Sequence, residues 1–343
     1  MAIGSLGNNV FNKDQSAKKS DKFNRLIISI SLTFICGIAF SFIVAINVFN
    51  LAVFIFAISE LVRVQLSTIY LAQKDEEQGT IIEVYPLIIG TLLAIIFTLL
   101  IRSVWARIYF YSFSSLIVSL WLGRKFIEAH ISKFKIANYR WKKQDIYPFL
   151  ITILISVLFL FEKLAVGKHG DIMLGIYGVN LSILLSSMFY SKWIENSYIS
   201  RECNSDRTLF FHVFSFISLV LVFSQLLPRL LPLLGLEEYI STNQNMLVLA
   251  FVPINILLIG LKLNLLYVRG DLYRITCIAI AVSLSVFLIL DEVLDLYWSL
   301  GILILYFLVD SVLFLLVFTK KTEHRLFFSS LFVVNLLIFL FIL

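Results

Sequence analysis

The sequence has little charge for its length. Only 15% of its 343 residues are Asp, Glu, Lys or Arg, whereas 60% are apolar, and the mean hydropathy is +0.94. Soluble domains carry about 25% charged residues and about half apolar ones. So few polar side chains cannot cover so much apolar surface. This excludes water-soluble enzymes, and it also excludes a nucleic-acid-binding protein despite the net charge of +6.

Glycine, proline, cysteine and histidine are also scarce, at 14, 5, 3 and 4 residues. The cysteines (Cys36, Cys203 and Cys277) are odd in number and predict neither a disulfide framework nor a paired metal-ligand spacing. The histidines lie far apart, so the sequence predicts no metal site and no cofactor. The 32 Phe suit helices in lipid better than a β-barrel, whose strands alternate polar and apolar residues. We therefore predict an all-α polytopic integral membrane protein.

Long apolar runs recur along the chain. A spanning helix needs about 20 mostly apolar residues, because a helix satisfies its own backbone in hydrocarbon. About eleven segments qualify, within a range of ten to twelve because two are short. They are Leu26–Ile46, Leu51–Ala72, Ile81–Ile101, Ile108–Leu122, Pro148–Val166, Ile172–Ile194, Leu209–Leu236, Met246–Val268, Tyr273–Leu290, Leu296–Phe318 and Leu326–Leu343. We expect Pro228 and Pro232 to kink or end the seventh before Leu236.

The distribution of charge divides these spans into two bundles. Residues 1–25 form a basic arm, and 26–122 hold the first bundle of four spans. A basic linker at 123–147, with seven Lys or Arg against two acids, separates them from a second bundle of six spans at 148–318. Residues 319–343 add a basic turn and a terminal span.

The orientation follows from the excess of Lys and Arg on the cytoplasmic side of membrane proteins. With the N-terminus in the cytoplasm, most of the 28 Lys and Arg residues fall in cytoplasmic segments. No small-residue cleavage site follows the first apolar run, so we expect a signal anchor in the cytoplasmic membrane and a basic arm attracted to anionic lipid. The outer loops are too short to fold into a catalytic domain.

Three stretches of the second bundle carry a resemblance to a known family: Tyr147–Ser156, Phe161–Gly167 and Leu174–Val179. They resemble the start of the second bundle in polysaccharide flippases, the Wzx-type members of the multidrug/oligosaccharidyl-lipid/polysaccharide exporter superfamily. In these proteins a helix that begins at a basic cytoplasmic loop carries an acid near its outer end. A Leu/Val-Gly-Ile-Tyr sequence then opens the next helix. The resemblance covers about residues 140–320.

The resemblance implies an exporter-like fold and a flippase that works by alternating access. Its substrate would be an oligosaccharide linked to undecaprenyl pyrophosphate, destined for surface polysaccharide such as O-antigen or capsule. Membrane lipid and the polymerase and chain-length machinery would be its partners. Family members have six helices in the first bundle, whereas this chain has four. Either the first bundle is shortened or an N-terminal portion is missing.

Seven charged residues lie within the spans. Each costs ~2.5–3.5 kcal/mol at a helix centre, so such residues are candidates for a functional site. The candidates for a substrate cavity are Glu60, Arg63, Glu162, Lys163, Arg229, Lys262 and Asp310. Each also has a structural interpretation. Glu60 and Arg63 share a helix face and can pair, whether they stabilise the packing or line a cavity.

The other five differ in their expected surroundings. Glu162 and Lys163 point about 100° apart and do not neutralise each other. We expect Glu162 to face the cavity. Arg229 reaches either a wet cavity or the interface, depending on where its helix ends. Lys262 lies near the cytoplasmic end and can snorkel. Asp310 requires a partner from another helix, which the sequence does not identify.

Several functions fit these residues. Cations in a wet cavity would lower the barrier to a pyrophosphate, and Arg matches phosphate geometry best. The acids would equally serve coupling to protons or sodium ions. A polysaccharide polymerase or polytopic glycosyltransferase is the enzyme alternative, although such enzymes need a larger outer loop. A drug or cation antiporter of the same superfamily predicts the same architecture. A membrane scaffold is the structural alternative.

Overall fold

The computed structural model describes seven parts of the chain, which are residues 55–70 (with gaps), 76–101, 104–131, 143–195 (except 189 and 192), 206–268 (except 235), 272–319 and 324–343. The expected basic arm and the first span, Leu26–Ile46, lie outside the described residues. The described parts contain α-helices and short 3₁₀ turns, and no strand. The chain divides into two compact units, unit 1 up to Asp145 and unit 2 from Ile146 to Leu343.

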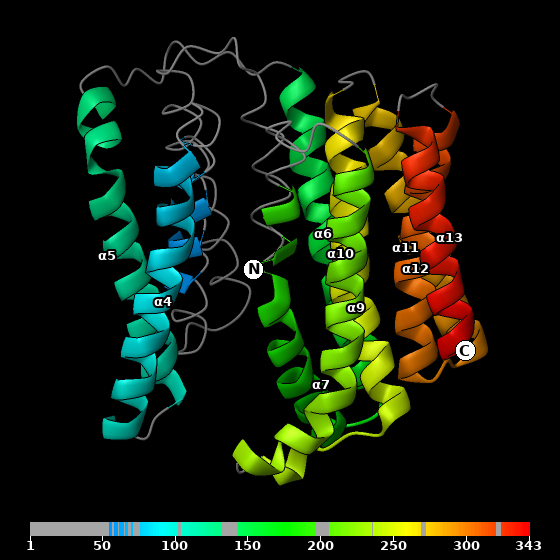
Figure 1. Ribbon diagram of the computed structural model, residues 1–343, viewed down its shortest axis with the longest axis horizontal. Coiled ribbons are helices and arrows are strands. Elements are labelled where there is room, and N and C mark those ends of the chain that lie inside the picture. Colours follow the sequence, from blue (N-terminus) through cyan, green and yellow to red (C-terminus); the bar gives the residue numbers. More distant parts are fainter. Residues whose placement is uncertain are drawn as a thin grey trace. The chain divides into compact units, whose positions relative to one another are not determined.

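Unit 1 contains α4 (Glu76–Ile101) and α5 (Val104–Ile131), which pack along one another (Figure 1). The described residues of 55–70 are helical as well. Val62, Leu66, Ile82 and Phe126 form a buried cluster among these three segments. Gly123 of α5 allows the close approach at this contact, because a Cβ there would lie 2.7 Å from Leu66 Cδ1 and the Leu66 side chain would have to move.

The helix α5 is longer than the predicted span Ile108–Leu122. The apolar run stops at Leu122 because polar and charged residues follow it, yet the helix continues to Ile131. The buried face of α5 also carries three serines, Ser112, Ser115 and Ser119. A helical serine can bond its hydroxyl to its own backbone, and Ser119 Oγ donates to the Ser115 carbonyl at 2.7 Å, whereas Ser115 Oγ has no partner among the described residues. Serines therefore interrupt the hydropathy of a helix without ending it.

Unit 2 is a bundle around one central helix. Its helices are α6 (Lys143–Gly167), α7 (Asp171–Leu184), α9 (Asp206–Leu230), α10 (Asn243–Val268), α11 (Tyr273–Leu294), α12 (Trp298–Thr319) and α13 (Arg325–Ile342). Helix α10 contacts α7, α9, α11, α12 and α13. Its apolar window is 94% buried, whereas the window of α9 is 33% buried. A helix that is apolar on every side is typical of such a central position.

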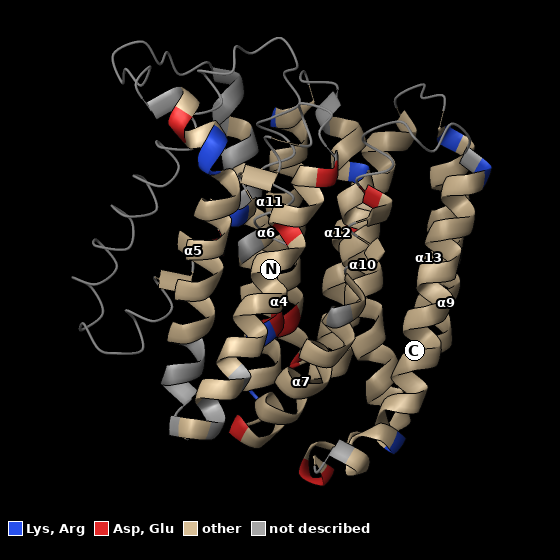
Figure 2. Ribbon diagram, turned by 60° about the vertical axis from the view of Figure 1, so that its left-hand side comes forward, with Lys and Arg blue, Asp and Glu red and all other residues tan. Residues whose placement is uncertain are grey.

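Five of the described helices, α9 to α13, are long and apolar enough to cross a membrane. The prediction of an all-α polytopic membrane protein is therefore confirmed. Figure 2 shows how few charged residues lie along the helices of unit 2. A charged side chain within a membrane span costs free energy unless another side chain pairs with it.

The structure shows where two of the predicted spans end or are interrupted. Helix α9 ends at Leu230, and 3₁₀ turns follow at Pro232–Leu234 and Glu237–Tyr239, so the prediction that this span ends before Leu236 is confirmed. The expected span Ile172–Ile194 is helical with one interruption, because α7 ends at Leu184, a 3₁₀ turn occupies Leu185–Ser187, and the described residues of 188–195 are helical again. Serines that bond their own backbone contribute to this interruption, since Ser187 Oγ donates to the Leu184 carbonyl at 2.6 Å.

Candidate functional site

A fully buried ion pair lies in the interior of unit 2. Lys262 of α10 donates from Nζ to Oδ1 of Asp310 on α12, and neither side chain is exposed to any measurable extent. The helix α13 contributes Asn335, whose Nδ2 donates to Asp310 Oδ2 at 3.0 Å. The same Nδ2 donates to Asn255 Oδ1 of α10 at 2.9 Å. We call these four residues the buried polar network.

The buried polar network satisfies its members across three helices. Both carboxylate oxygens of Asp310 accept a hydrogen bond, and Asn335 uses both amide hydrogens. Asn255 Nδ2 donates in return to Asn335 Oδ1 at 3.3 Å and to the Phe251 carbonyl at 3.0 Å. A satisfied buried network adds rigidity and specifies one arrangement of its helices, and removing one member leaves the others unpaired in a low dielectric.

Lys262 does not snorkel to the interface, so that expectation is wrong. It lies on α10, which five other helices of unit 2 contact, and its side chain has no route to water along that helix. The partner that Asp310 requires is this lysine, 48 residues earlier in the chain. The structure therefore joins two candidates that sequence reasoning treated separately.

A second buried contact lies on the same face of α12. Tyr306 precedes Asp310 by one helical turn, and its hydroxyl donates to Glu162 Oε2 of α6. Glu162 is 1% exposed and Tyr306 is fully buried, whereas Lys163 is exposed. The prediction that neighbouring Glu162 and Lys163 point apart is confirmed. Helix α12 thus holds an acid of its own and contacts an acid of α6.

Arg229 is not part of these contacts. It lies in the last turn of α9, is exposed, and makes no hydrogen bond or ion pair with the described part of the chain. Because α9 ends at Leu230, the structure favours the interfacial position for Arg229 over a place in a kink. Lys163 and Arg229 are thus the two candidates of unit 2 that the structure leaves outside its interior.

Glu60 and Arg63 form the predicted pair in unit 1. Arg63 Nη2 lies 2.5 Å from Glu60 Oε2, and Arg63 is 3% exposed. Arg63 Nη1 also donates to the Glu83 carbonyl of α4 at 2.9 Å. From α5, the Tyr111 hydroxyl donates to Glu60 Oε1 at 3.2 Å. The pair therefore links both neighbouring helices of the unit.

Sequence reasoning missed the neutral partners of these charges. Tyr306, Asn255, Asn335 and Tyr111 carry no charge, so a search for charged residues in the spans passes over them. A search for amides in the apolar runs and for tyrosines one turn from an intramembrane acid would have found Asn255, Asn335 and Tyr306, but not Tyr111, whose partner lies 51 residues away. Such groups must find partners in hydrocarbon, as charges must. In the described residues no group of three His, Cys, Asp or Glu is placed to hold a metal ion.

An ion pair at one end of unit 2 involves a residue outside the spans. Lys168, in the turn after α6, donates from Nζ to Asp291 Oδ2 of α11. This hydrogen bond raises the pKa of Lys168 above its ordinary value of 10.5. A raised folded-state pKa means that the stabilisation is present at neutral pH and is lost only as the pH rises through that pKa, above about 10.5.

The contribution of Lys168 to stability is expected to be small. The Lys168 side chain is 41% exposed, so solvent screens the pair from the lysine side, although the Asp291 side chain is only 9% exposed. We expect Lys168→Gln to lower the free energy of unfolding by at most about 1 kcal/mol. The measurement is the midpoint of thermal unfolding at pH 7 in detergent, in low and in high salt. A larger loss, or one that high salt does not diminish, contradicts the assignment as a screened surface pair.

Comparisons with known proteins give one structural similarity. No protein-family model matches the sequence, and no curated protein matches it either. The fold is similar to that of a multidrug resistance MATE family transporter of the MOP superfamily, solved in an outward-facing conformation. The TM-score is 0.49 at 10% identity, over 99% of this chain and 84% of that chain. A similarity at this level assigns neither a family nor a substrate.

Proposed function

We propose that the protein is a transporter in the cytoplasmic membrane that moves an oligosaccharide linked to undecaprenyl pyrophosphate by alternating access. The placement of Glu162 is the observation that carries the proposal. The resemblance to polysaccharide flippases expects an acid near the outer end of the helix that follows the basic loop. Glu162 is the residue of this chain that matches that acid; it lies five residues before the end of α6 at Gly167, is 1% exposed, and accepts a hydrogen bond from Tyr306.

The second argument is the cost of the buried groups. Each charge at a helix centre costs ~2.5–3.5 kcal/mol on insertion, and a scaffold could be built from apolar residues at less cost. Unit 2 nevertheless buries the side chains of Glu162, Lys262 and Asp310 between its helices. Residues of this kind in a membrane mark substrate and ion pathways.

The arrangement on α12 suits a coupled conformational change. Tyr306 and Asp310 lie on one face of this helix and hold α6 through Glu162 and α10 through Lys262. Hydrogen-bonded pairs have discrete alternatives, so a shift of α12 exchanges partners instead of stretching contacts. Binding of a proton or a sodium ion at either acid would favour one arrangement, which would couple ion movement to export.

The test is a complementation experiment with Glu162→Gln in a deletion strain. We expect surface glycan to fall roughly tenfold or more, because the amide still accepts the hydrogen bond from Tyr306 but carries neither the negative charge nor the titratable group that would bind a coupling ion. Lipid-linked single repeat units should accumulate on the cytoplasmic leaflet, which a sidedness assay measures. The matched control is Lys163→Gln, which changes the adjacent exposed residue and should leave export near the wild-type level. Both variants must be present in the membrane in normal amounts.

Other outcomes of this experiment would contradict the proposal. Single units that reach the outer surface without extension would identify a polymerase, with the enzyme alternative that the sequence left open. An unchanged glycan profile in the deletion strain, together with increased drug sensitivity, would identify an antiporter. Normal export by Glu162→Gln would show that the Glu162 carboxylate has no role in transport and would contradict the proposal.

A further inference from the structure

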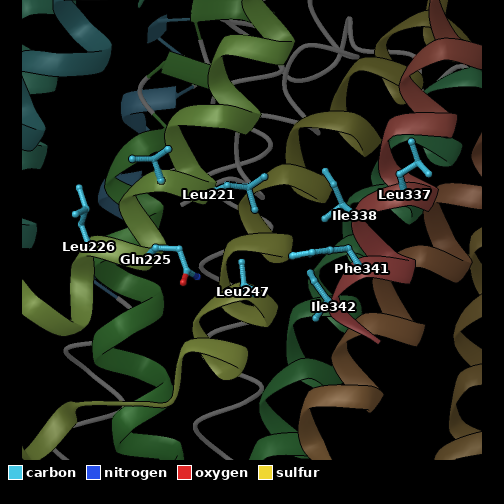
Figure 3. A pocket seen from close by; sticks show the side chains of 9 residues that line it. Leu221, Gln225, Leu226, Leu247, Leu337, Ile338, Phe341 and Ile342 are labelled. Atoms are coloured by element: carbon cyan, nitrogen blue, oxygen red, sulfur yellow. The ribbon is translucent and has the colours of Figure 1, made fainter.

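An apolar groove opens on the side of unit 2, with a volume of about 710 Å³. Figure 3 shows its three walls, which are α9 from Leu221 to Leu226, α10 at Leu247, and α13 from Leu337 to Ile342. These stretches lie at the end of the bundle where α9 and α13 end and α10 begins. The volume lies within the range of about 300–1,000 Å³ that is typical of small-molecule sites.

The groove faces hydrocarbon. All three of its helices are long and apolar enough to span a membrane. Gln225 is its one polar lining residue, and Val222, Leu337 and Phe341 are 59%, 60% and 79% exposed. Side chains at this depth meet acyl chains instead of water, so an open groove here takes up a hydrocarbon chain.

The cationic side chain of Arg229 lies one helical turn beyond the groove residue Gln225. Arg229 follows Gln225 by one helical turn, so the two side chains lie on the same face of α9. Arg229 is exposed and has no hydrogen-bond or ion-pair partner within the described ranges. It also lies next to the last residue of α9, at the level where headgroups meet the helix end.

We propose that the groove binds an anionic glycerophospholipid, with one acyl chain between α9, α10 and α13 and its phosphate on Arg229. A guanidinium forms two parallel hydrogen bonds to a phosphate, which gives the site its preference for an anionic headgroup. The second acyl chain remains in the bilayer, because the groove is open on that side.

The acids that follow α9 in the chain, Glu237 and Glu238, do not line the groove. Glu237 and Glu238 belong to the 3₁₀ turn that ends at Tyr239. Asn180 of α7 donates to the Tyr239 carbonyl at 2.8 Å, so this turn packs against α7. Among the described residues, neither carboxylate forms an ion pair with Arg229.

The test is lipid binding to the purified full-length protein in detergent, measured by native mass spectrometry. Phosphatidylglycerol and phosphatidylcholine with identical chains are titrated separately. We expect phosphatidylglycerol to bind roughly fivefold more tightly, and Arg229→Gln to abolish this preference. The matched control is Arg207→Gln, which removes an exposed cation from the opposite end of α9 and should preserve the preference.

A second variant tests the acyl-chain part of the site. Leu247→Trp fills the floor of the groove and should weaken the binding of both lipids about tenfold. Where this variant does not fold, Val222→Trp fills the groove from an exposed position. The variants must keep the unfolding midpoint of the wild type for the comparison to hold.

Three results would overturn the proposal. The first is a preference for phosphatidylglycerol that survives Arg229→Gln. The second is unchanged binding of both lipids when the groove is filled. The third is binding of undecaprenyl phosphate that phosphatidylglycerol does not displace, which would assign the groove to a polyprenyl chain instead. None of these results depends on whether the protein exports an oligosaccharide.

Discussion

Lys262→Met is expected to lower the free energy of unfolding by about 3–5 kcal/mol. Methionine fills nearly the same space as the lysine stem, so the loss comes from the charge and not from a cavity. Asp310 would keep its hydrogen bond from Asn335 but lose its cation, in a site that excludes water. The measurement is the midpoint of thermal or chemical unfolding in detergent, with hydrogen exchange of α10 and α12 as the local probe.

A double variant separates pairing from packing. Lys262→Met combined with Asp310→Asn removes both charges and retains an acceptor for Asn335. We expect most of the lost stability to return, with a coupling energy of at least about 2 kcal/mol in the double-mutant cycle. Lys163→Met is the matched control, since that lysine is exposed, and it should change stability by less than about 0.5 kcal/mol. Purely additive effects of the two substitutions would contradict the pair.

The double variant also bears on the role of the buried polar network. Replacing a buried ion pair with neutral residues is often neutral or stabilising, so such pairs are not retained for stability alone. If Lys262→Met with Asp310→Asn folds well but does not restore export, the pair serves the transport cycle. If it restores export, the pair specifies how α10, α12 and α13 pack.

The sequence predicts the helices of unit 2 well because the bilayer constrains them strongly. A spanning segment must be apolar and about 20 residues long, and both properties are local. The predicted helix boundaries differ from the structure at two places where polar residues lie at the end of an apolar run or inside it. Helix α5 continues past its apolar run, and α7 ends at Leu184 inside an apolar one. In α5 the charged residues after Leu122 end the apolar run but not the helix. In α7 a serine hydroxyl bonds a nearby carbonyl where the helix gives way to a 3₁₀ turn.

The sequence does not predict which charges meet. Glu60 and Arg63 pair locally, so helical spacing alone predicts them. Lys262 and Asp310 are 48 residues apart, and any cation in the spans was a possible partner for this acid. What could have been recognised is that α10 is apolar on all sides, and such a helix occupies the centre of a bundle. A lysine on a central helix needs an internal partner because it has no interface to reach.

Unit 1 offers the second large effect. Arg63→Met is expected to destabilise unit 1 by about 3 kcal/mol, because among the described residues it leaves the Glu60 carboxylate with the Tyr111 hydroxyl alone. It also removes the donor to the Glu83 carbonyl at 2.9 Å. The measurement is hydrogen exchange of α4 and α5, which reports this unit separately from unit 2. Lys125→Met on α5 is the matched control, since Lys125 is exposed and should cause less than about 0.5 kcal/mol of change.

Arg63→Lys distinguishes charge from geometry in the same experiment. A lysine keeps the charge beside Glu60 but presents one ammonium instead of a planar fork, so it cannot serve both Glu60 and the Glu83 carbonyl in the same way. We expect its stability to lie between those of the wild type and Arg63→Met. Full stability of Arg63→Lys would show that charge alone holds the contact. Equal loss in both variants would instead show that the bond to the α4 backbone is what joins residues 55–70 to that helix.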